Sequence, residues 1–542
     1  MTRLSRFRLL GHVMAEKFEN ALRPACLLVQ QIEPSYAELV VHVDDGGQSE
    51  DDEAGPAQLV AQLMELLQAM LPSQPLKALL KGRVRSLLQL LVPFMRVTEA
   101  QARSWRDDPN EFLAHEEDER VQGCAVRLSG EYLLGELLGG MKRETGRVVA
   151  ALSSELLERG ESGRGAGDAR AWKLTELGFL ILGAAVGGLS VKALQRSEFM
   201  PMVPTALAKA AQLCGDRAVP DLLRARAFAL LRKLGDVVCN SAVGDVPAML
   251  EASAAGLGAE EPLVVRVAAC RSFCRFVTAV RNKALCDRLL LERGVLASLG
   301  SLMRGADEEL LHLTLESLCI IVRQCPETIV SGADSLSALI LEIWRKSLAD
   351  PMVSLQVLDL VSCACAMDIR MQRALEEGLL PAIAADLRQG ADPHIASSAV
   401  QLYSVLLKRT QVPFEPAVWG IVGPLISVAT SSDESGLLEN VCDVLVCLVE
   451  RSPNQVIENG FLVSVLRCVE HLLDPSLDDN ACCFAGPLLS LLLSKFGKLL
   501  PADVVVGLLR VVVQRLVRAQ LPYLKQELLV VVARLLCEDL VG

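Results

Sequence analysis

Aromatic residues are scarce in this chain: Phe, Trp and Tyr together make up only 4 % of its 542 residues. Leu, Val and Ala dominate instead, which suits packed helices better than sheets, because strands favour β-branched and aromatic side chains. Hydrophobic residues nevertheless reach 51 %, so disorder is excluded as the main state. Since single cores stop growing at roughly 300 residues, the chain consists of several domains or of one elongated repeat array.

Motifs for catalysis and metal binding are missing from the sequence. It contains no phosphate-binding loop, dinucleotide fingerprint, nucleophile elbow or paired-histidine zinc motif. None of its six histidines stands at metal-ligand spacing to another, and we interpret His312 as an ordinary residue of a helix. We therefore predict no catalytic residue, no metal site and no cofactor, and we expect a binding protein rather than an enzyme.

The 17 cysteines do not have the spacing of a disulfide framework or of a zinc site. Cys270 and Cys274 fall on the apolar face of a predicted helix together with Leu263, Val267 and Val277. We therefore interpret the cysteines as small buried residues of a reduced cytosolic protein.

Net charge and hydropathy limit the possible partners. With 54 basic and 66 acidic residues the formal charge is −12, which disfavours direct nucleic-acid binding and favours basic protein partners. No charge-free apolar run reaches the ~18 residues that a membrane span needs, so we predict no membrane insertion. The basic amphipathic start, MTRLSRFRLLGHVMAEKF, fits an incomplete helix better than an organellar presequence.

The strongest pattern is a repeat. Six segments begin on or beside an acidic residue and continue into an apolar helical pattern, with a seventh, earlier member at Asp221. The six marker acids are Glu261, Asp307, Asp350, Asp392, Asp433 and Asp474, which are 41 to 46 residues apart. This period is that of HEAT or armadillo units, and Asp at a helix start accepts hydrogen bonds from free N–H groups. We predict an all-α HEAT/armadillo-type superhelix (an α-solenoid) of about eleven repeats.

Within this array the sequence predicts three segments. Residues 1–56 form an N-terminal segment with an acidic loop, 57–171 form irregular repeats, and 172–542 form the regular array. The irregular part is expected to contain a helix pair, Leu59–Leu71 and Leu76–Met95, and a Gly-rich loop, Arg159–Arg170. In the regular part each repeat is expected to contain two helices, and the second helix of two repeats is expected at Leu336–Lys346 and Leu379–Leu387, after short turns. The first helix of one repeat carries Leu311, Leu315, Leu318 and Val322 on a single face.

Two acidic segments are the candidate binding sites. Neither contains a Lys or Arg, and both could be solvated loops or could attract a basic partner over a distance that salt screens. The candidate residues are Asp44, Asp45, Glu50, Asp51, Asp52 and Glu53 in the first, and Asp107, Asp108, Glu111, Glu116, Glu117, Asp118 and Glu119 in the second.

The second acidic segment lies in a stretch that resembles importin-β family receptors, in which V-T-E-x-Q-x-x-x-W-x-x-x-P-x-x-F leads into an acidic loop. The matching positions are Val97, Thr98, Glu99, Gln101, Trp105, Pro109 and Phe112. Further stretches are similar in the same order: WKLTELGFLILGA, LLRARAFALLRKLGDVV, PLVVRVAACRSFCRF, LESLCIIVRQCPE, EIWRKSLADPMV and LDPSLDDNACCFAGPLLSLLLSKFGKLL. The resemblance runs from about Val43 to about Leu540.

The resemblance implies a monomeric nuclear import receptor that shuttles between cytoplasm and nucleus through the nuclear pore. Its implied partners are basic cargo proteins such as histones and ribosomal proteins, the GTPase Ran, and nucleoporins with Phe-Gly (FG) repeats. The family's N-terminal Ran-binding repeats have no recognisable counterpart before Val43, and its C-terminal region has none beyond Leu540. We therefore expect the central portion of such a receptor, or a short form. The alternative is a HEAT-repeat scaffold subunit of a multiprotein complex without a transport role.

Overall fold

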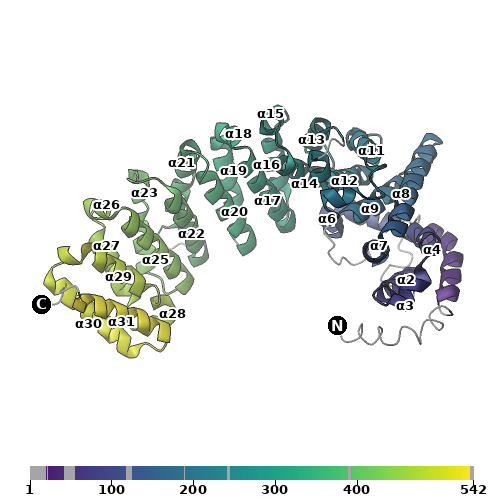
Figure 1. Ribbon diagram of the computed structural model, residues 1–542. Coiled ribbons are helices and arrows are strands. Elements are labelled where there is room, and N and C mark those ends of the chain that lie inside the picture. Colours follow the sequence, from purple (N-terminus) through teal and green to yellow (C-terminus); the bar gives the residue numbers. More distant parts are fainter. Residues whose placement is uncertain are drawn as a thin grey trace. The chain divides into compact units, whose positions relative to one another are not determined.

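The computed structural model describes residues 20, 22–41, 55–116, 125–187, 189–240, 244–348, 350–388 and 392–537. Within these ranges every regular element is a helix (Figure 1), as expected from a sequence rich in Leu and Ala and poor in aromatic residues. Contacts divide the chain into two units, Met1–Gly305 and Ala306–Gly542, which we call unit 1 and unit 2. The three predicted segments and the number of repeats stay predictions.

Unit 2 is built from two layers of helices. The first layer holds α17 (Glu308–Gln324), α20 (Pro351–Cys365), α22 (Pro393–Arg409) and α25 (Ser435–Arg451), each packed on the next. The second holds α18 (Pro326–Ser331), α19 (Ala333–Lys346), α21 (Ile369–Asp386), α23 (Pro416–Trp419), α24 (Val422–Thr430), α26 (Pro453–Glu458) and α27 (Leu462–Leu472). Unit 2 ends with four further helices, which are α28 (Asp479–Cys482), α29 (Ala485–Phe496), α30 (Ala502–Arg518) and α31 (Pro522–Cys537). Because each helix covers its neighbours' apolar faces, the core is continuous along the unit.

Three of the marker acids cap helices as the sequence predicts. Asp307 accepts a hydrogen bond from the Leu310 amide at 2.9 Å, Asp350 from the Met352 amide at 2.8 Å, and Asp392 from the His394 amide at 2.8 Å. These bonds satisfy N–H groups that have no partner inside the helix.

The other markers mark the repeat without capping its helix in this way. Asp433 precedes the N-cap Glu434, which makes no side-chain cap. Asp474 binds the amide of Ser476 in a turn, and Asp478 caps the following helix instead. Glu261 is buried beside Arg224, 2.6 Å away. An acidic residue near a helix start is therefore a sign of the period, but its bonding partner differs between repeats.

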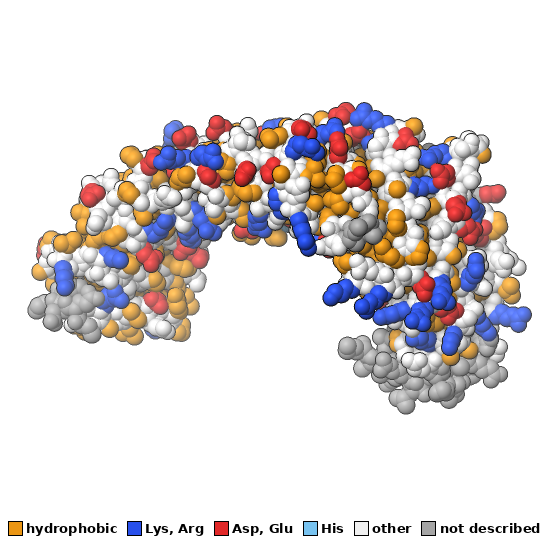
Figure 2. Space-filling view, turned by 45° about the horizontal axis from the view of Figure 1, so that its top comes forward, with side chains coloured by type: hydrophobic (Ala, Val, Ile, Leu, Met, Phe, Trp, Pro, Cys, Tyr) orange, Lys and Arg blue, Asp and Glu red, His pale blue; other side chains and the backbone are white. Residues whose placement is uncertain are grey.

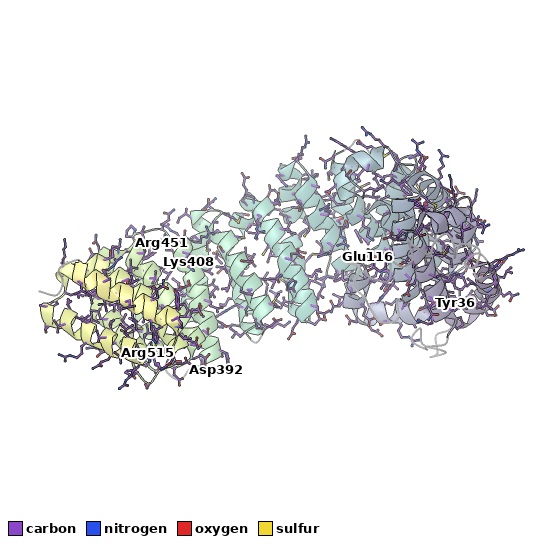
Figure 3. All side chains as sticks on the ribbon, turned by 60° about the horizontal axis from the view of Figure 1, so that its bottom comes forward. Tyr36, Glu116, Asp392, Lys408, Arg451 and Arg515 are labelled. Atoms are coloured by element: carbon purple, nitrogen blue, oxygen red, sulfur yellow. The ribbon has the colours of Figure 1, made fainter. Side chains whose placement is uncertain are left out.

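Hydrogen bonds between neighbouring repeats confirm the period directly. Arg451 donates to the Thr410 carbonyl at 2.7 Å, 41 positions earlier, and so covers free carbonyls at the end of α22. Asn440 bonds Ser397 across 43 positions, and the His312 ring lies 3.0 Å from Gln356 across 44. His312 is thus a structural residue between two helices, as predicted. Arg451 and Lys408 both lie in this part of unit 2 (Figure 3).

Unit 1 begins with a helix at residues 22–36 that continues into η1 (Ala37–Val41). Its other elements are α2 (Pro56–Met70), α3 (Gln74–Leu80), α4 (Val84–Leu91), η2 (Val92–Met95), α5 (Glu99–Asp107), α6 (Pro109–Glu116), α7 (Ala125–Gly140), α8 (Lys142–Gly165), α9 (Trp172–Val186), α10 (Val191–Gln195), α11 (Val203–Gly215), α12 (Asp221–Asn240), α13 (Val246–Ala255), α14 (Leu263–Ala279), α15 (Lys283–Glu292) and α16 (Val295–Gly305). The pairs α8–α9 and α12–α14 have the most extensive contacts in this unit.

Several predicted boundaries are wrong, and glycine explains three of them. The predicted helix Leu76–Met95 is broken at Gly82, whose φ of 77° ends α3 before α4 begins. The predicted loop Arg159–Arg170 is helical as far as Gly165. A Cβ at Gly160 would lie 2.2 Å from Thr175 Oγ1, so the glycine lets α9 approach a continuous α8. The helix predicted to start at Leu379 starts at Ile369, because Gly378 is a close-packing position against Ser337 rather than a turn.

The predicted core faces are largely confirmed. Leu311, Leu315, Leu318 and Val322 are all buried, as are Cys270 and Cys274, whereas Leu263 at the first turn of α14 is 40 % exposed. The cysteines that the structure describes are free, and within the described ranges no group of acidic, His and Cys side chains could hold a metal ion. One helical stretch, Asp479–Leu499, is long and apolar enough to cross a membrane, but half of it is buried against other helices. We interpret it as core.

Candidate functional site

The stretch that carries the family resemblance folds into α5 and α6 and not into an open loop. Thr98 and Gln101 form a capping box at the start of α5: the Thr98 hydroxyl accepts from the Gln101 amide, and the Gln101 side chain accepts from the Thr98 amide, each at 3.1 Å. Asp108 accepts from the Asn110 amide at 2.9 Å at the start of α6. The motif therefore has a local structural role, in which it sets the beginnings of two consecutive helices.

Trp105 of this motif is fully buried in a cluster of rings and guanidinium groups. Phe112 meets it edge-on with ring centres 5.5 Å apart, and the His115 ring lies 5.4 Å away. The guanidinium of Arg127 on α7 lies 5.4 Å from the Trp105 ring, and that of Arg226 on α12 lies 5.3 Å from Phe112. Cation–π contacts of this kind gain strength where water is excluded.

The carboxylate of Glu176 joins these two arginines. Its Oε1 lies 2.6 Å from Arg127 Nη2 and 2.9 Å from Arg226 Nε, and all three side chains are almost completely buried. Glu176 lies on α9, so one carboxylate connects three helices that are distant in sequence. Burial lowers the pKa of Arg226 to about 9, which leaves the guanidinium charged at neutral pH. We call Glu116, Arg127, Glu176 and Arg226, with His115, the buried ion cluster.

A second ion pair ties α9 to the start of the motif. Lys173 Nζ lies 2.9 Å from Glu99 Oε1 and donates to the Val41 carbonyl at 2.8 Å. Burial lowers the pKa of Lys173, against the opposing effect of Glu99. Positions that resemble the family in separate stretches, Glu99, Trp105, Lys173, Glu176 and Arg226, therefore meet in one place. Sequence patterns do not single out Arg127, because nothing local distinguishes it from a surface arginine.

Glu116 corrects one expectation about the second acidic segment. It is only 8 % exposed and pairs with Arg226, while Lys233 lies 3.6 Å from its other oxygen. Figure 3 places it among the helices of unit 1. The charge of Glu116 is therefore neutralised within the fold, because Arg226 and Lys233 lie beside its buried carboxylate, and it is not available to a partner on the surface.

Of the remaining acidic candidate residues, the structure describes three. Asp107 and Asp108 are exposed at the junction of α5 and α6, and Glu111 is half-buried and accepts a hydrogen bond from Ser104. The other candidates lie outside the described residues: Asp44, Asp45, Glu50, Asp51, Asp52, Glu53, Glu117, Asp118 and Glu119. The basic start of the chain, residues 1–19, lies outside them as well.

Unit 2 contains an apolar slot that the sequence does not reveal. It lies between α21 and the α23–α24 segment, has a volume of about 540 Å³, and is lined by Leu380, Pro381, Ala384, Val418 and Ile421. Arg373, Glu377 and Glu415 lie at its polar edge. The α23 side of the slot is a helix of only four residues, Pro416–Trp419.

Comparisons with known proteins point to nuclear transport receptors as similar proteins. No family model matches the chain. Importin-9 of Drosophila melanogaster is 22 % identical over 499 residues, which cover 88 % of this chain and 48 % of the relative. Importin subunit beta-5 of Schizosaccharomyces pombe is 24 % identical over 291 residues, covering 51 % and 28 %. The chain thus spans about half or less of the length of these curated relatives.

Solved structures with the same fold are also transport receptors. The exportin Cse1 in its cargo-free, cytoplasmic state has a TM-score of 0.61 at 13 % identity, covering 97 % of this chain and 55 % of that one. Lph2, a bidirectional nuclear transport receptor of S. cerevisiae, has a TM-score of 0.60 at 13 % identity, with 95 % and 53 % covered.

The chain is similar to importin-β family receptors. The two sequence relatives are importins and the two structural neighbours are transport receptors, which agrees with the predicted resemblance and with the predicted all-α solenoid class. Residues that carry the family resemblance build the buried ion cluster, so they hold the helices of unit 1 together.

We expect Glu176→Gln to destabilise the chain by about 3–5 kcal/mol, because two buried guanidinium groups lose their shared counter-ion. Equilibrium urea unfolding followed by circular dichroism measures the change. Glu251→Gln is the matched control, since Glu251 pairs with Arg293 at an exposed site and should cost less than about 1 kcal/mol. Equal effects of the two substitutions would show that the cluster is not a special source of stability.

His115 makes unit 1 sensitive to acid. Burial, followed by the charges of Arg127, Arg226 and Lys233, lowers the pKa of His115 well below its usual value. The unfolded chain protonates this residue below pH 6.5, whereas the folded chain protonates it only at a lower pH. Stability should therefore fall as the pH drops below that value, by about 1.4 kcal/mol per pH unit until the folded pKa is reached.

We expect His115→Gln to remove this pH-dependent loss, measured as the difference in unfolding free energy between about pH 7.5 and pH 5.5. His394→Gln, at an exposed position on α22, should keep the wild-type loss. If His115→Gln loses as much stability as the wild type over this range, another group is responsible.

Proposed function

We propose that this chain acts as a nuclear transport receptor, or as the central portion of one, and that it carries basic proteins into the nucleus. The observation that supports this most is the meeting of separate family-like stretches in one buried ion cluster, which random similarity between helical repeats would not produce. The two importin relatives support the same reading. Such a receptor would move between cytoplasm and nucleus through the nuclear pore, as a monomer.

The proposed cargo is basic, with histones and ribosomal proteins as the expected examples. The chain has a net charge of −12, and its two acidic segments contain no Lys or Arg that would neutralise them. Opposite charge speeds the encounter of two proteins and orients them before close contacts form. On the second segment the acids proposed to meet cargo are Asp107, Asp108, Glu111, Glu117, Asp118 and Glu119, without the buried Glu116.

Ran and FG nucleoporins are the other proposed partners. Support comes from the structural neighbour Kap121p, whose structures were solved bound to RanGTP, with a TM-score of 0.54, and to Nup53p, with a TM-score of 0.50. In a complete receptor, Ran in its GTP form would compete with cargo. For nucleoporins, the apolar slot at Leu380 and Ile421 offers a place for a Phe ring.

We expect the triple substitution Glu117→Lys, Asp118→Lys and Glu119→Lys to weaken binding of purified core histones by at least about tenfold at low salt, because the substitutions reverse the local attraction. Binding is measured by pull-down or anisotropy, and it should weaken further for both proteins as salt rises from about 0.05 to 0.5 M. Thermal stability should remain nearly unchanged.

The matched control changes the same amount of charge elsewhere. Glu158, Glu439 and Glu470 are exposed on α8, α25 and α27, and their replacement by Lys should reduce histone affinity much less. Absence of histone binding by the wild type at low salt would count against basic cargo. Equal losses in both triple variants would mean that only the net charge matters.

Binding of FG repeats separates a transport receptor from a scaffold subunit. We expect an FG-repeat peptide to bind the wild type, and Ala384→Trp to reduce that binding severalfold by filling the slot between α21 and α24. Ala502→Trp, at the exposed start of α30, should have no effect. Failure of the wild type to bind any FG repeat would favour the HEAT scaffold alternative.

A further inference from the structure

A basic patch lies on unit 1 where the α3–α4 turn meets the beginning of α8. The Gly82 amide donates to Glu144 Oε1 at 2.8 Å, which holds the turn against the first turn of α8. Lys81 and Arg83 flank Gly82 and are exposed, and Lys142 and Arg143 are exposed just before Glu144. The hydrogen bond thus brings two pairs of cations from distant parts of the sequence onto one surface.

The patch continues from α8 towards α10. Arg147 Nε lies 3.4 Å from Glu198 Oε1 across this junction, and Arg196 is exposed two residues before Glu198. Of these residues, Lys81, Lys142 and Arg143 form no ion pair with another described residue. Lys and Arg therefore outnumber the two nearby carboxylates, Glu144 and Glu198, on this surface, although the whole chain is acidic. Figure 2 shows Lys and Arg side chains gathered on one face of the chain, with some acidic side chains among them.

An apolar pocket opens beside the patch and shares residues with it. It has a volume of about 530 Å³, and its walls include Leu138, Ala185, Leu189 and Phe199 from α7, α9 and the segments around α10. Lys142, Arg143, Arg196 and Glu198 also line it, so three cations and one carboxylate stand at an apolar cavity. Gly135 and Gly139 of α7 line it as well, and a Cβ at either position would meet no atom within 4 Å, so a larger side chain there has room to enter the pocket.

We propose that the basic patch and this pocket form a docking site for an acidic peptide segment of a partner protein. An apolar side chain of the segment fills the pocket, and its Asp and Glu side chains pair with Lys142, Arg143 and Arg196. Charge complementarity identifies the acidic character of the partner, and the apolar walls identify a side chain as the buried group. Nucleic acid fits less well, because its binding relies on phosphates and on stacking platforms. The site is distinct from the acidic segments proposed for basic cargo, and it takes a partner of opposite charge.

The test uses the full chain and a fluorescent peptide rich in Asp and Glu that carries one Leu and one Phe. A second peptide of equal charge has Ser in place of both apolar residues, and a single-stranded oligonucleotide of equal charge is the third probe. We expect the first peptide to bind, and the other two to bind at least about tenfold more weakly, because neither fills the pocket.

Two variants remove the two halves of the site separately. The double substitution Lys142→Glu and Arg143→Glu should weaken binding of the first peptide at least about tenfold and reduce the salt dependence of that binding. Gly135→Leu should weaken binding of the same peptide to a similar extent by filling the pocket, and the salt dependence should equal that of the wild type. The matched controls in unit 2 are Lys495→Glu with Lys498→Glu, which changes the same charge, and Gly507→Leu, a helical glycine with equally open surroundings.

The controls should bind the peptide as the wild type does, and circular dichroism melts confirm that every variant is folded. If the Ser peptide binds with the same affinity as the first peptide, or if Gly135→Leu has no effect on binding, the proposal that the pocket holds an apolar side chain is wrong. Tighter binding of the oligonucleotide than of the peptide would overturn the choice of partner in favour of phosphate recognition. The failure of basic cargo to bind would leave this result unaffected.

Discussion

The carboxylate of Glu176, shared by the buried guanidinium groups of Arg127 and Arg226, is the interaction on which unit 1 depends. A buried carboxylate or guanidinium alone is costly, and each becomes tolerable only because its counter-ion lies at hydrogen-bond distance. Hydrophobic contacts between helices tolerate small slips, since they have no direction. A shared ion pair does not, because two donors must reach one oxygen. The cluster therefore specifies how α7, α9 and α12 pack, and it closes the motif helices α5 and α6 over them through Trp105 and Glu116.

In unit 2 the packing of neighbouring helices is specified by contacts that recur from repeat to repeat. Its repeats are joined by leucine and valine faces, by hydrogen bonds between neighbouring repeats such as those from Arg451 to the end of α22, and by the ion pair of Arg515 with Asp479. Each repeat contacts mainly its neighbours, so stability adds up along the array. Glycines serve both regions, since Gly160 and Gly378 permit close approaches that any side chain would prevent.

The basic patch at Gly82 and Lys142 belongs to unit 1. The acidic segments proposed for basic cargo belong to the same half of the sequence, and the two proposals concern partners of opposite charge. The basic patch persists in an acidic chain because its cations belong to separate helices and have few carboxylates beside them. The adjoining pocket adds shape to charge, and shape is what allows one partner to be distinguished from another of the same charge.

The sequence by itself determined the repeat period, the helical class and the buried cysteine faces, because periodicity and capping depend on residues close together in the chain. It also placed Asp307, Asp350 and Asp392 correctly at helix starts. It did not determine that Glu116 is buried, that the Gly-rich stretch at Arg159 is helical, or that Gly378 lies within a helix. Those features depend on which distant side chain lies opposite: Arg226 for Glu116, Thr175 for Gly160 and Ser337 for Gly378. Only the tertiary structure brings these partners together, so only the tertiary structure decides which acids remain free to bind and where slots and pockets open.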